Sequence, residues 1–114
     1  MEGCVFCKIV SRQVPAEVVY EDDQVLVFQD IRPVAPVHYL LIPKKHIPTF
    51  FDLKAEDESI VGHLQRVAGI VAREAGLDQK GFRLVSNCLE GGGQLVFHLH
   101  YHLLAGRALG WPPG

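Results

Sequence analysis

The sequence predicts an α+β domain built on one antiparallel sheet, and three observations carry this prediction. Short apolar segments typical of strands lie on both sides of a single segment with helical periodicity. Asp, Pro and Gly residues separate these segments and favour turns between them. Strands that follow one another, then one long helix and further strands, favour an antiparallel sheet over a parallel one. A length of 114 residues fits a single domain, residues 1–114.

The first half of the chain is expected to hold one short helix and three strands. The segments around Asp22 and Asp23 are rich in β-branched and aromatic residues, which predicts a hairpin that turns there. The segment IRPVAP follows as a loop, because proline cannot donate a backbone hydrogen bond. The next strand is almost continuously apolar, which indicates a central place in the sheet. In chain order, these elements are residues 4–12, 18–22, 24–30 and 38–43.

The second half begins with a change of period. Apolar residues recur at steps of three and four between residues 56 and 75, which predicts a helix with one buried face. Gly76 can end this helix in the left-handed conformation. His63 lies on the apolar side, where we expect a packed or interface side chain and not a ligand. Two more strands are predicted, with a glycine loop between them: residues 82–87, 95–104 and 91–93 respectively.

The composition narrows the classes of function. A formal net charge of −2 provides no basic surface, which disfavours binding to nucleic acid or to anionic membranes. No apolar run approaches the roughly 20 residues that span a bilayer, and the first residues do not resemble a signal peptide. We therefore expect a cytoplasmic protein whose partners include neither nucleic acid nor a membrane.

Three alternating histidines stand out in the segment FHLHYHLL: His98, His100 and His102. In a strand they would share one face, with Phe97 and the other apolar neighbours buried on the opposite face. The pattern admits a solvent-exposed polar face, a zinc site or a catalytic face. One zinc ion is hard to reach from all three positions, because the outer two would lie about 13 Å apart. A catalytic face suits histidine, whose ordinary pKa near 6.5 leaves a neutral, nucleophilic nitrogen.

Two further features bear on this choice. The glycines at 91–93 precede the histidines, and glycine-rich backbone can turn its amides toward an anion. A flexible loop is the simpler interpretation of these glycines taken alone. Asp30, at the end of a predicted strand, could accept hydrogen bonds from sugar hydroxyls or could be an ordinary turn residue. Together these features favour a site for a phosphorylated ligand.

At this point the chain resembles a known family. The segment His98-Leu-His100-Tyr-His102-Leu-Leu matches the signature of the histidine triad (HIT) superfamily. The resemblance extends over FQDIRPVAPVHYLLIPKKHI, GHLQRVAG, the region of Asn87 and GGGQ, and the terminal GWPPG, and is closest to the nucleoside phosphoramidase (Hint) branch. It implies a five-stranded antiparallel sheet with two helices, joined into a ten-stranded sheet in a homodimer.

The resemblance also implies an activity and its residues. The activity is hydrolysis of adenosine or guanosine 5′-phosphoramidates to the nucleoside monophosphate and an amine, through a nucleotidyl-histidine intermediate, with no cofactor needed for catalysis. His100 matches the nucleophile, His102 the histidine that bonds the phosphate oxygens, and His38 a fourth histidine of the cluster. Asp30 matches the ribose-binding carboxylate. The base pocket and the phosphate region would consist of Phe6, Ile9, Phe28, Ile31, Asn87, Gly93, Gln94, Leu95 and Val96.

Two features of this chain qualify the resemblance. Some members hold a structural zinc, whose ligands here would be Cys4, Cys7, His46 and His98. A pair of reduced cysteines packed as small apolar residues is the alternative. Leu95 stands where phosphoramidases usually have a serine, which puts efficient cleavage in question. Other functions therefore stay open, namely a dinucleoside polyphosphate hydrolase or nucleotidyl transferase, or a nucleotide- or partner-binding module with weak catalysis.

Overall fold

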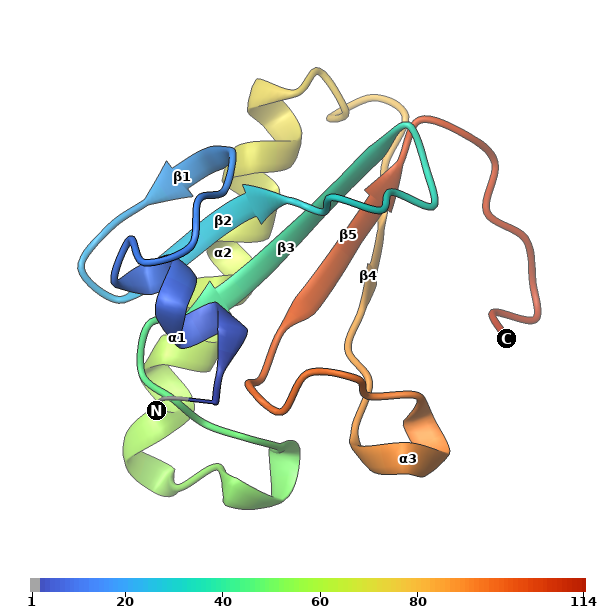
Figure 1. Cartoon of the computed structure of the whole chain (residues 1–114). Coiled ribbons are helices and arrows are strands. Elements are labelled where there is room, and N and C mark those ends of the chain that lie inside the picture. The colour runs from blue at the N-terminus through green and yellow to red at the C-terminus, as the bar shows by residue number, and fades with distance from the viewer. Residues whose placement is uncertain (1–2) are drawn as a thin grey trace.

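The computed structural model describes residues 3–114, and its centre is one five-stranded antiparallel sheet (Figure 1). The spatial order of the strands is β1-β2-β3-β5-β4, so β3 is central, as its apolar sequence predicts. This confirms the predicted fold class. The strands are β1 Val18–Glu21, β2 Val25–Gln29, β3 Val37–Pro43, β4 Arg83–Val85 and β5 Tyr101–Ala105. Two helices, α1 (Val5–Val10) and α2 (Glu58–Glu74), account for most of the helical residues.

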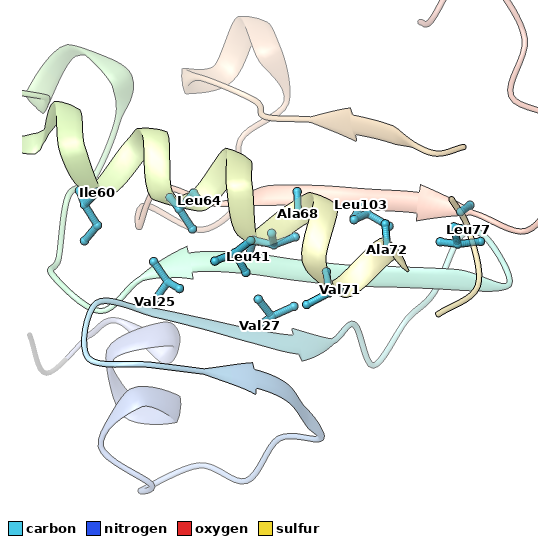
Figure 2. Close-up of a cluster of buried hydrophobic side chains, with 12 residues drawn as sticks. Val25, Val27, Leu41, Ile60, Leu64, Ala68, Val71, Ala72, Leu77 and Leu103 are labelled. Carbon is cyan, nitrogen blue, oxygen red and sulfur yellow. The ribbon is translucent and has the colours of Figure 1, made fainter. Parts of the chain in front are cut away.

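The long helix α2 covers one face of the sheet and forms the larger core (Figure 2). Its side chains at steps of three and four pack on the odd-numbered residues of the central strands, because alternate strand residues share a face. Leu64, Leu41 and Leu103 are fully buried in this contact. Gly76 lies just beyond the helix with φ of +77°, which confirms the predicted left-handed stop.

The short helix α1 covers the opposite face and forms a second core. Phe6 and Ile9 pack on the even-numbered residues of β2 and β3, which include Leu26, Phe28 and Leu40. His38 and His102 belong to the same face, since they share the parity of Leu40 and lie on adjacent strands in register. These two histidines therefore lie on the same face of the sheet as the apolar side chains that α1 covers.

The last strand is shorter than predicted, and this corrects the expectation for residues 95–104. The β3–β5 ladder ends at the pair Leu41–Tyr101, and β3 continues alongside β2 alone as far as Pro43. Beyond that point the Pro43 carbonyl accepts from Nε2 of His98 at 2.7 Å, and the Leu99 amide donates to Ile47. Side-chain and loop contacts thus replace the ladder.

The shorter strand changes the surroundings of two predicted residues. The three histidines do not share one straight strand, because His98 and His100 precede β5. Phe97, expected in the core, is 49% exposed. The alternation of apolar and polar residues therefore begins several residues before the segment that pairs as a strand.

The glycine segment is also ordered differently from the prediction. Residues Leu89–Gly92 form one helical turn, α3, which ends at Gly93 in the left-handed conformation. The strand expected over 82–87 is confined to Arg83–Val85. Between β3 and α2 lie two 3₁₀ turns, Phe50–Asp52 and Ala55–Asp57.

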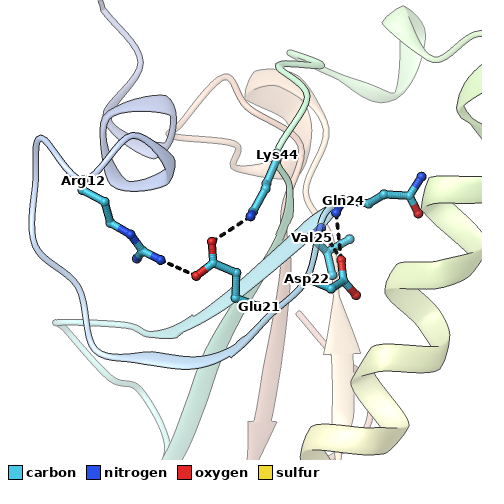
Figure 3. A network of polar contacts seen from close by, with 6 residues as sticks. All are labelled: Arg12, Glu21, Asp22, Gln24, Val25 and Lys44. Atoms are coloured by element: carbon cyan, nitrogen blue, oxygen red, sulfur yellow. Dashed lines mark hydrogen bonds and ion pairs between the residues drawn. The ribbon is translucent and has the colours of Figure 1, made fainter.

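Polar contacts fix the hairpin and the segment after α1 (Figure 3). The Asp22 carboxylate accepts from the amides of Gln24 and Val25 at 2.8 and 2.9 Å, which makes the predicted turn. Glu21 accepts from Arg12 and, at 2.7 Å, from Lys44. Within residues 3–114, no helix has both the length and the apolar character needed to cross a bilayer.

Candidate active site and metal centre

A pocket of about 490 Å³ opens on the α1 face of the sheet, a volume within the usual range for small-molecule sites. Its walls come from α1, β2, β3, β5 and the segment after α3. Predicted site residues line it: Phe6, Ile9, Phe28, Asp30, Ile31, His38, Asn87, Gly93, Leu95, Val96, His100 and His102. Ile31 and Leu95 are at its rim, about 90% exposed. The pocket is also lined by three residues between α1 and β1: Val14, Pro15 and Ala16. No pattern in the sequence marked them as site residues.

Hydrogen bonds determine which nitrogen of each histidine carries a proton. The Val34 amide can only donate, so Nδ1 of His38 accepts from it at 3.1 Å. The proton of a neutral His38 ring is therefore on Nε2, which lies 2.8 Å from Nδ1 of His102. His102 accepts there, and its own proton is on Nε2. That N–H group is then available to a ligand as a donor.

His100 has the opposite tautomer. Its Nδ1 lies 2.7 Å from the carbonyl oxygen of His98, which can only accept, so the proton is on Nδ1. Nε2 of His100 is therefore unprotonated and free to act as a nucleophile. Burial lowers the pKa of His100 and of His38, and it lowers the pKa of His102 to about 4. All three rings are neutral near pH 7, which the tautomers require.

Asp30 lies beside the histidines. Its Oδ1 accepts from the Arg32 amide at 2.8 Å, and its Oδ2 lies 3.3 Å from Nε2 of His38. Asp30, His38 and His102 bring their ligand atoms close enough to suggest a metal. However, the 2.8 Å between the two histidine nitrogens is a hydrogen-bond distance, shorter than the roughly 3.3 Å that a tetrahedral zinc imposes. We interpret this group as a hydrogen-bonded relay.

Gln94 is the one residue of the predicted phosphate region that does not line the pocket. Its buried side chain donates to the carbonyls of Pro48 and Val96 and accepts from the Leu89 amide. The amides of Gly93 and Gln94 donate to carbonyls of α3, at Glu90 and Leu89. These amides are not available to an anion. Among the described residues, the amides of Leu95 and Val96, which follow in the chain and line the pocket, have no backbone acceptor and are therefore free to donate to an anion.

The second group of site residues lies at the other side of α1. The ligand atoms of Cys4, Cys7, His46 and His98 all lie within 4.8 Å of one another. Nδ1 of His98 is 3.3 Å from Sγ of Cys4, 3.6 Å from Sγ of Cys7 and 3.3 Å from Nδ1 of His46. Zinc bond lengths in a tetrahedron give edges of about 3.3 Å between nitrogens and about 3.6 Å between nitrogen and sulfur. The donor set therefore fits a tetrahedral zinc ion.

The pKa values of two members of this set are shifted toward their uncharged forms. Burial and the adjacent Cys4 thiol raise the pKa of Cys7, and burial lowers the pKa of His98 to about 4. A bound cation would stabilise the thiolate form of both cysteines, so that the thiols would lose their protons on binding. The Pro43 carbonyl accepts from Nε2 of His98 and orients its Nδ1 toward the cysteines. The sequence contains no signal for this carbonyl, because any residue has one.

His63 lies apart from both groups, on the other face of the sheet. Its Nε2 is 2.6 Å from Oδ2 of Asp22, and its side chain is about a quarter exposed. The packed role expected from its place on α2 is thus accompanied by a hydrogen bond to the hairpin turn. Cys88 is free and half-buried, and no contact of the structure assigns it a role.

Known proteins resemble this chain over nearly its whole length. The model of the family described as "Scavenger mRNA decapping enzyme C-term binding" matches residues 3–109. An uncharacterized HIT-like protein of Synechococcus elongatus is 48% identical over 99% of this chain and 98% of its own length.

Solved structures agree with this result. The crystal structure of a HIT family hydrolase from Legionella pneumophila has a TM-score of 0.96 and 49% identity, covering 98% of this chain and all of that one. A histidine triad nucleotide-binding protein from Candida albicans has a TM-score of 0.84 and 27% identity, with 96% and 83% of the two chains covered.

Proposed function

The chain belongs to the histidine triad superfamily, and from this premise we propose that it is a purine nucleoside phosphoramidase. Its substrates would be adenosine or guanosine 5′-phosphoramidates, which it would hydrolyse to nucleoside monophosphate and amine. The observation that carries the proposal is the pair of opposite tautomers. The free Nε2 of His100 and the Nε2–H of His102 belong to the same pocket, as a nucleophile and a donor must.

The reaction would proceed in two displacements. Nε2 of His100 attacks the α-phosphorus, a nitrogen–phosphorus bond forms, and the bond to the amine breaks as the amine takes up a proton from solvent. Water then attacks phosphorus and releases a proton to solvent, the bond to His100 breaks, and the ring returns to its neutral form. His102 and the amides of Leu95 and Val96 would donate to the charged phosphate oxygens in both steps. Positioning and hydrogen bonding supply what this chemistry needs from the protein.

The nucleoside would be held by the apolar part of the pocket. Phe6, Ile9 and Phe28 are buried and form a wall that suits a purine ring, with Ile31 at the rim. Asp30 is about a fifth exposed and has oxygen lone pairs left for the ribose hydroxyls. The wall makes no hydrogen bonds that would distinguish adenine from guanine.

We also propose that Cys4, Cys7, His46 and His98 hold a structural zinc ion. The support is the fit of their mutual distances to a tetrahedral site. When bound, the ion would tie the start of α1 to the segment that leads into β5, and its binding energy would be folding energy. Protein purified without chelator should contain about one zinc per chain. Less than a tenth of an equivalent would contradict the proposal.

We propose further that the protein is a cytoplasmic homodimer whose two sheets join into one of ten strands. The supporting features are the short edge strand β4 and the exposed apolar side chains outside the pocket, such as Phe82, Leu89 and Trp111. Pairing of two β4 edges about a twofold axis would satisfy their free backbone groups.

The activity can be tested directly with adenosine 5′-phosphoramidate, by following release of AMP. We expect turnover by the wild type and none by His100→Ala, because the covalent route disappears with the nucleophile. The matched control is His63→Asn, which removes a histidine outside the pocket. A His100→Ala protein with a tenth of the wild-type rate would contradict the mechanism. Faster turnover of ATP or diadenosine polyphosphate would favour a nucleotidyl transferase or polyphosphate hydrolase instead.

A further inference from the structure

The helix α1 belongs to both groups of site residues. Cys4 is its N-cap and Cys7 lies in its first turn, and these two contribute to the tetrahedral donor set. Phe6 and Ile9, three residues apart on another side of the same helix, line the nucleotide pocket. One helix of six residues therefore presents one side to each site, and any shift of the helix changes both.

The Phe6 ring is in contact with both groups. Its centroid lies 5.8 Å from that of His98, a member of the donor set, at an interplanar angle of 72°. It lies 5.1 Å from the ring of His100, the proposed nucleophile, at 88°. Both are edge-to-face arrangements of the kind that aromatic rings prefer. The His98 carbonyl also holds Nδ1 of His100 at 2.7 Å, so a movement of His98 reaches the nucleophile by two routes.

A helix of this length depends on its surroundings for stability, because isolated helices shorter than about 12 residues are marginal in water. Its C-terminal end is tied down by Arg12, which bonds Glu21, which in turn bonds Lys44 (Figure 3). Its first turn is held by the packing of Phe6 on β2 and β3 and by Cys4 and Cys7, whose sulfur atoms lie against His98 and His46. The position of this turn, which carries Phe6, therefore depends in part on the donor set.

We propose that α1 couples the two sites, so that zinc bound by the donor set and nucleotide bound in the pocket each raise the affinity for the other. The inference rests on the zinc ion and the nucleotide site proposed above. Coupling between two ligands is reciprocal by thermodynamic necessity, so both affinities must change by the same factor. Coupling of this kind typically amounts to about five- to 150-fold.

The two halves of the linkage can be measured separately. The dissociation constant of zinc is obtained by competition with a chromophoric chelator, with and without saturating AMP. The dissociation constant of AMP is obtained by calorimetry on zinc-loaded and on metal-free protein. We expect AMP to tighten zinc binding and zinc to tighten AMP binding by one common factor of at least five. Neither measurement depends on enzymatic turnover.

Variants locate the coupling in α1. Phe6→Leu keeps an apolar side chain but lacks the ring that touches both His98 and His100, and it should reduce the factor toward one. Asp30→Asn should weaken AMP binding while leaving the factor as in the wild type, because the polar contacts of Asp30 are with Arg32 and His38, which belong to neither α1 nor the donor set. Lys8→Ala is the matched control on the same helix, since Lys8 belongs to neither site. It should change none of the constants.

Amide hydrogen exchange separates a local change from general unfolding. In the metal-free protein we expect faster exchange at residues 5–11, with protection retained in β3. Equal zinc affinity with and without AMP, in a protein that binds both, would overturn the coupling. A wild-type factor that Phe6→Leu leaves unchanged would overturn the role of α1. Failure to bind zinc, or failure to bind AMP, would each overturn the inference and would identify which premise is wrong.

Discussion

At the scale of single residues, the chemistry of the pocket follows from backbone groups that have only one possible role. The Val34 amide must donate and the His98 carbonyl must accept, and these two contacts assign opposite tautomers to His38 and His100. Imidazole is suited to this control because each nitrogen can either donate or accept. A ring with an unprotonated Nε2 and a ring with a protonated Nε2 thus arise from the same residue type, according to what the other nitrogen of each ring contacts.

Leu95 leads to a prediction at this scale. It is 91% exposed at the rim of the pocket and can neither donate to nor accept from a departing amine. Leu95→Ser supplies a hydroxyl there, and we expect kcat/KM for amine leaving groups to rise about ten- to a hundredfold, equivalent to about 1–3 kcal/mol. A substrate with an acidic leaving group should gain little, because its departure needs no proton.

The control is Leu95→Ala, which removes the side chain without adding a hydroxyl. Both substrates share the nucleotide half, so differences in binding largely cancel in the ratio of their kcat/KM values. Equal gains for the two substrates, or equal gains for the serine and alanine variants, would show that the hydroxyl does not act on the leaving group.

At the scale of elements, the β1–β2 hairpin is fastened to α2 by the carboxylate of Asp22. This side chain accepts from His63 at 2.6 Å and from Tyr20 at 2.8 Å, in addition to the two amides of the turn. Burial alone would raise the pKa of Asp22, but these hydrogen bonds outweigh it and hold the pKa well below its ordinary value. The folded state therefore stabilises the ionised carboxylate of Asp22 more than the unfolded state does.

The sign of the pH dependence follows from this shift. A carboxyl whose pKa is lower in the folded state stabilises the fold above its unfolded pKa, about 3.9, and loses that contribution as pH falls toward the folded pKa. We expect Asp22→Asn to lower the free energy of unfolding at pH 7 by about 1–2 kcal/mol, since the amide keeps the turn but cannot accept from Tyr20 and His63 through its nitrogen.

Urea unfolding of wild type and variant at several pH values checks this expectation. The difference should be constant between pH 5 and 7, within the range where the carboxyl is ionised in both states, and should shrink below about pH 4. Asp23→Asn, at the exposed neighbouring position, is the control and should cost little. A difference that stays constant down to pH 2 would contradict the assignment to Asp22 ionisation.

At the scale of the whole molecule, the C-terminal segment extends away from the sheet beyond β5 (Figure 1). Arg83, on the edge strand β4, donates to the carbonyls of Leu109 and Gly110 at 3.2 and 2.7 Å. The following Trp111 is 84% exposed in the single chain. In the proposed dimer, we expect this segment to lie across the interface, near the nucleotide pocket of the second copy, as the family resemblance implies.

Deletion of residues 110–114 tests that arrangement. We expect the dimer mass to be unchanged by light scattering, because the sheet edges would still pair, while the ratio of kcat/KM between bulky and small amine substrates changes severalfold. Trp111→Ala is the milder companion variant and should act in the same direction. Unchanged ratios across several amines, or a monomeric deletion variant, would contradict this account of the segment.

The sequence alone determined the periodic parts of the fold and most residues of the pocket. The hairpin at Asp22, the apolar central strand and the long helix ending at Gly76 follow from patterns within single segments, because alternation and 3.6-residue periodicity record which face is buried. The pocket residues were identified through the resemblance to a family, which stores tertiary information that one segment lacks.

The tertiary structure decided the features in which distant segments meet. The early end of β5, the exposure of Phe97 and the direction of His98 depend on Pro43 and Ile47, which are some 50 residues away in the chain. The use of Gln94 to fasten α3 to Pro48 is of the same kind. Backbone carbonyls and amides make these contacts, and every residue has them, so the one-dimensional pattern of side chains does not record them.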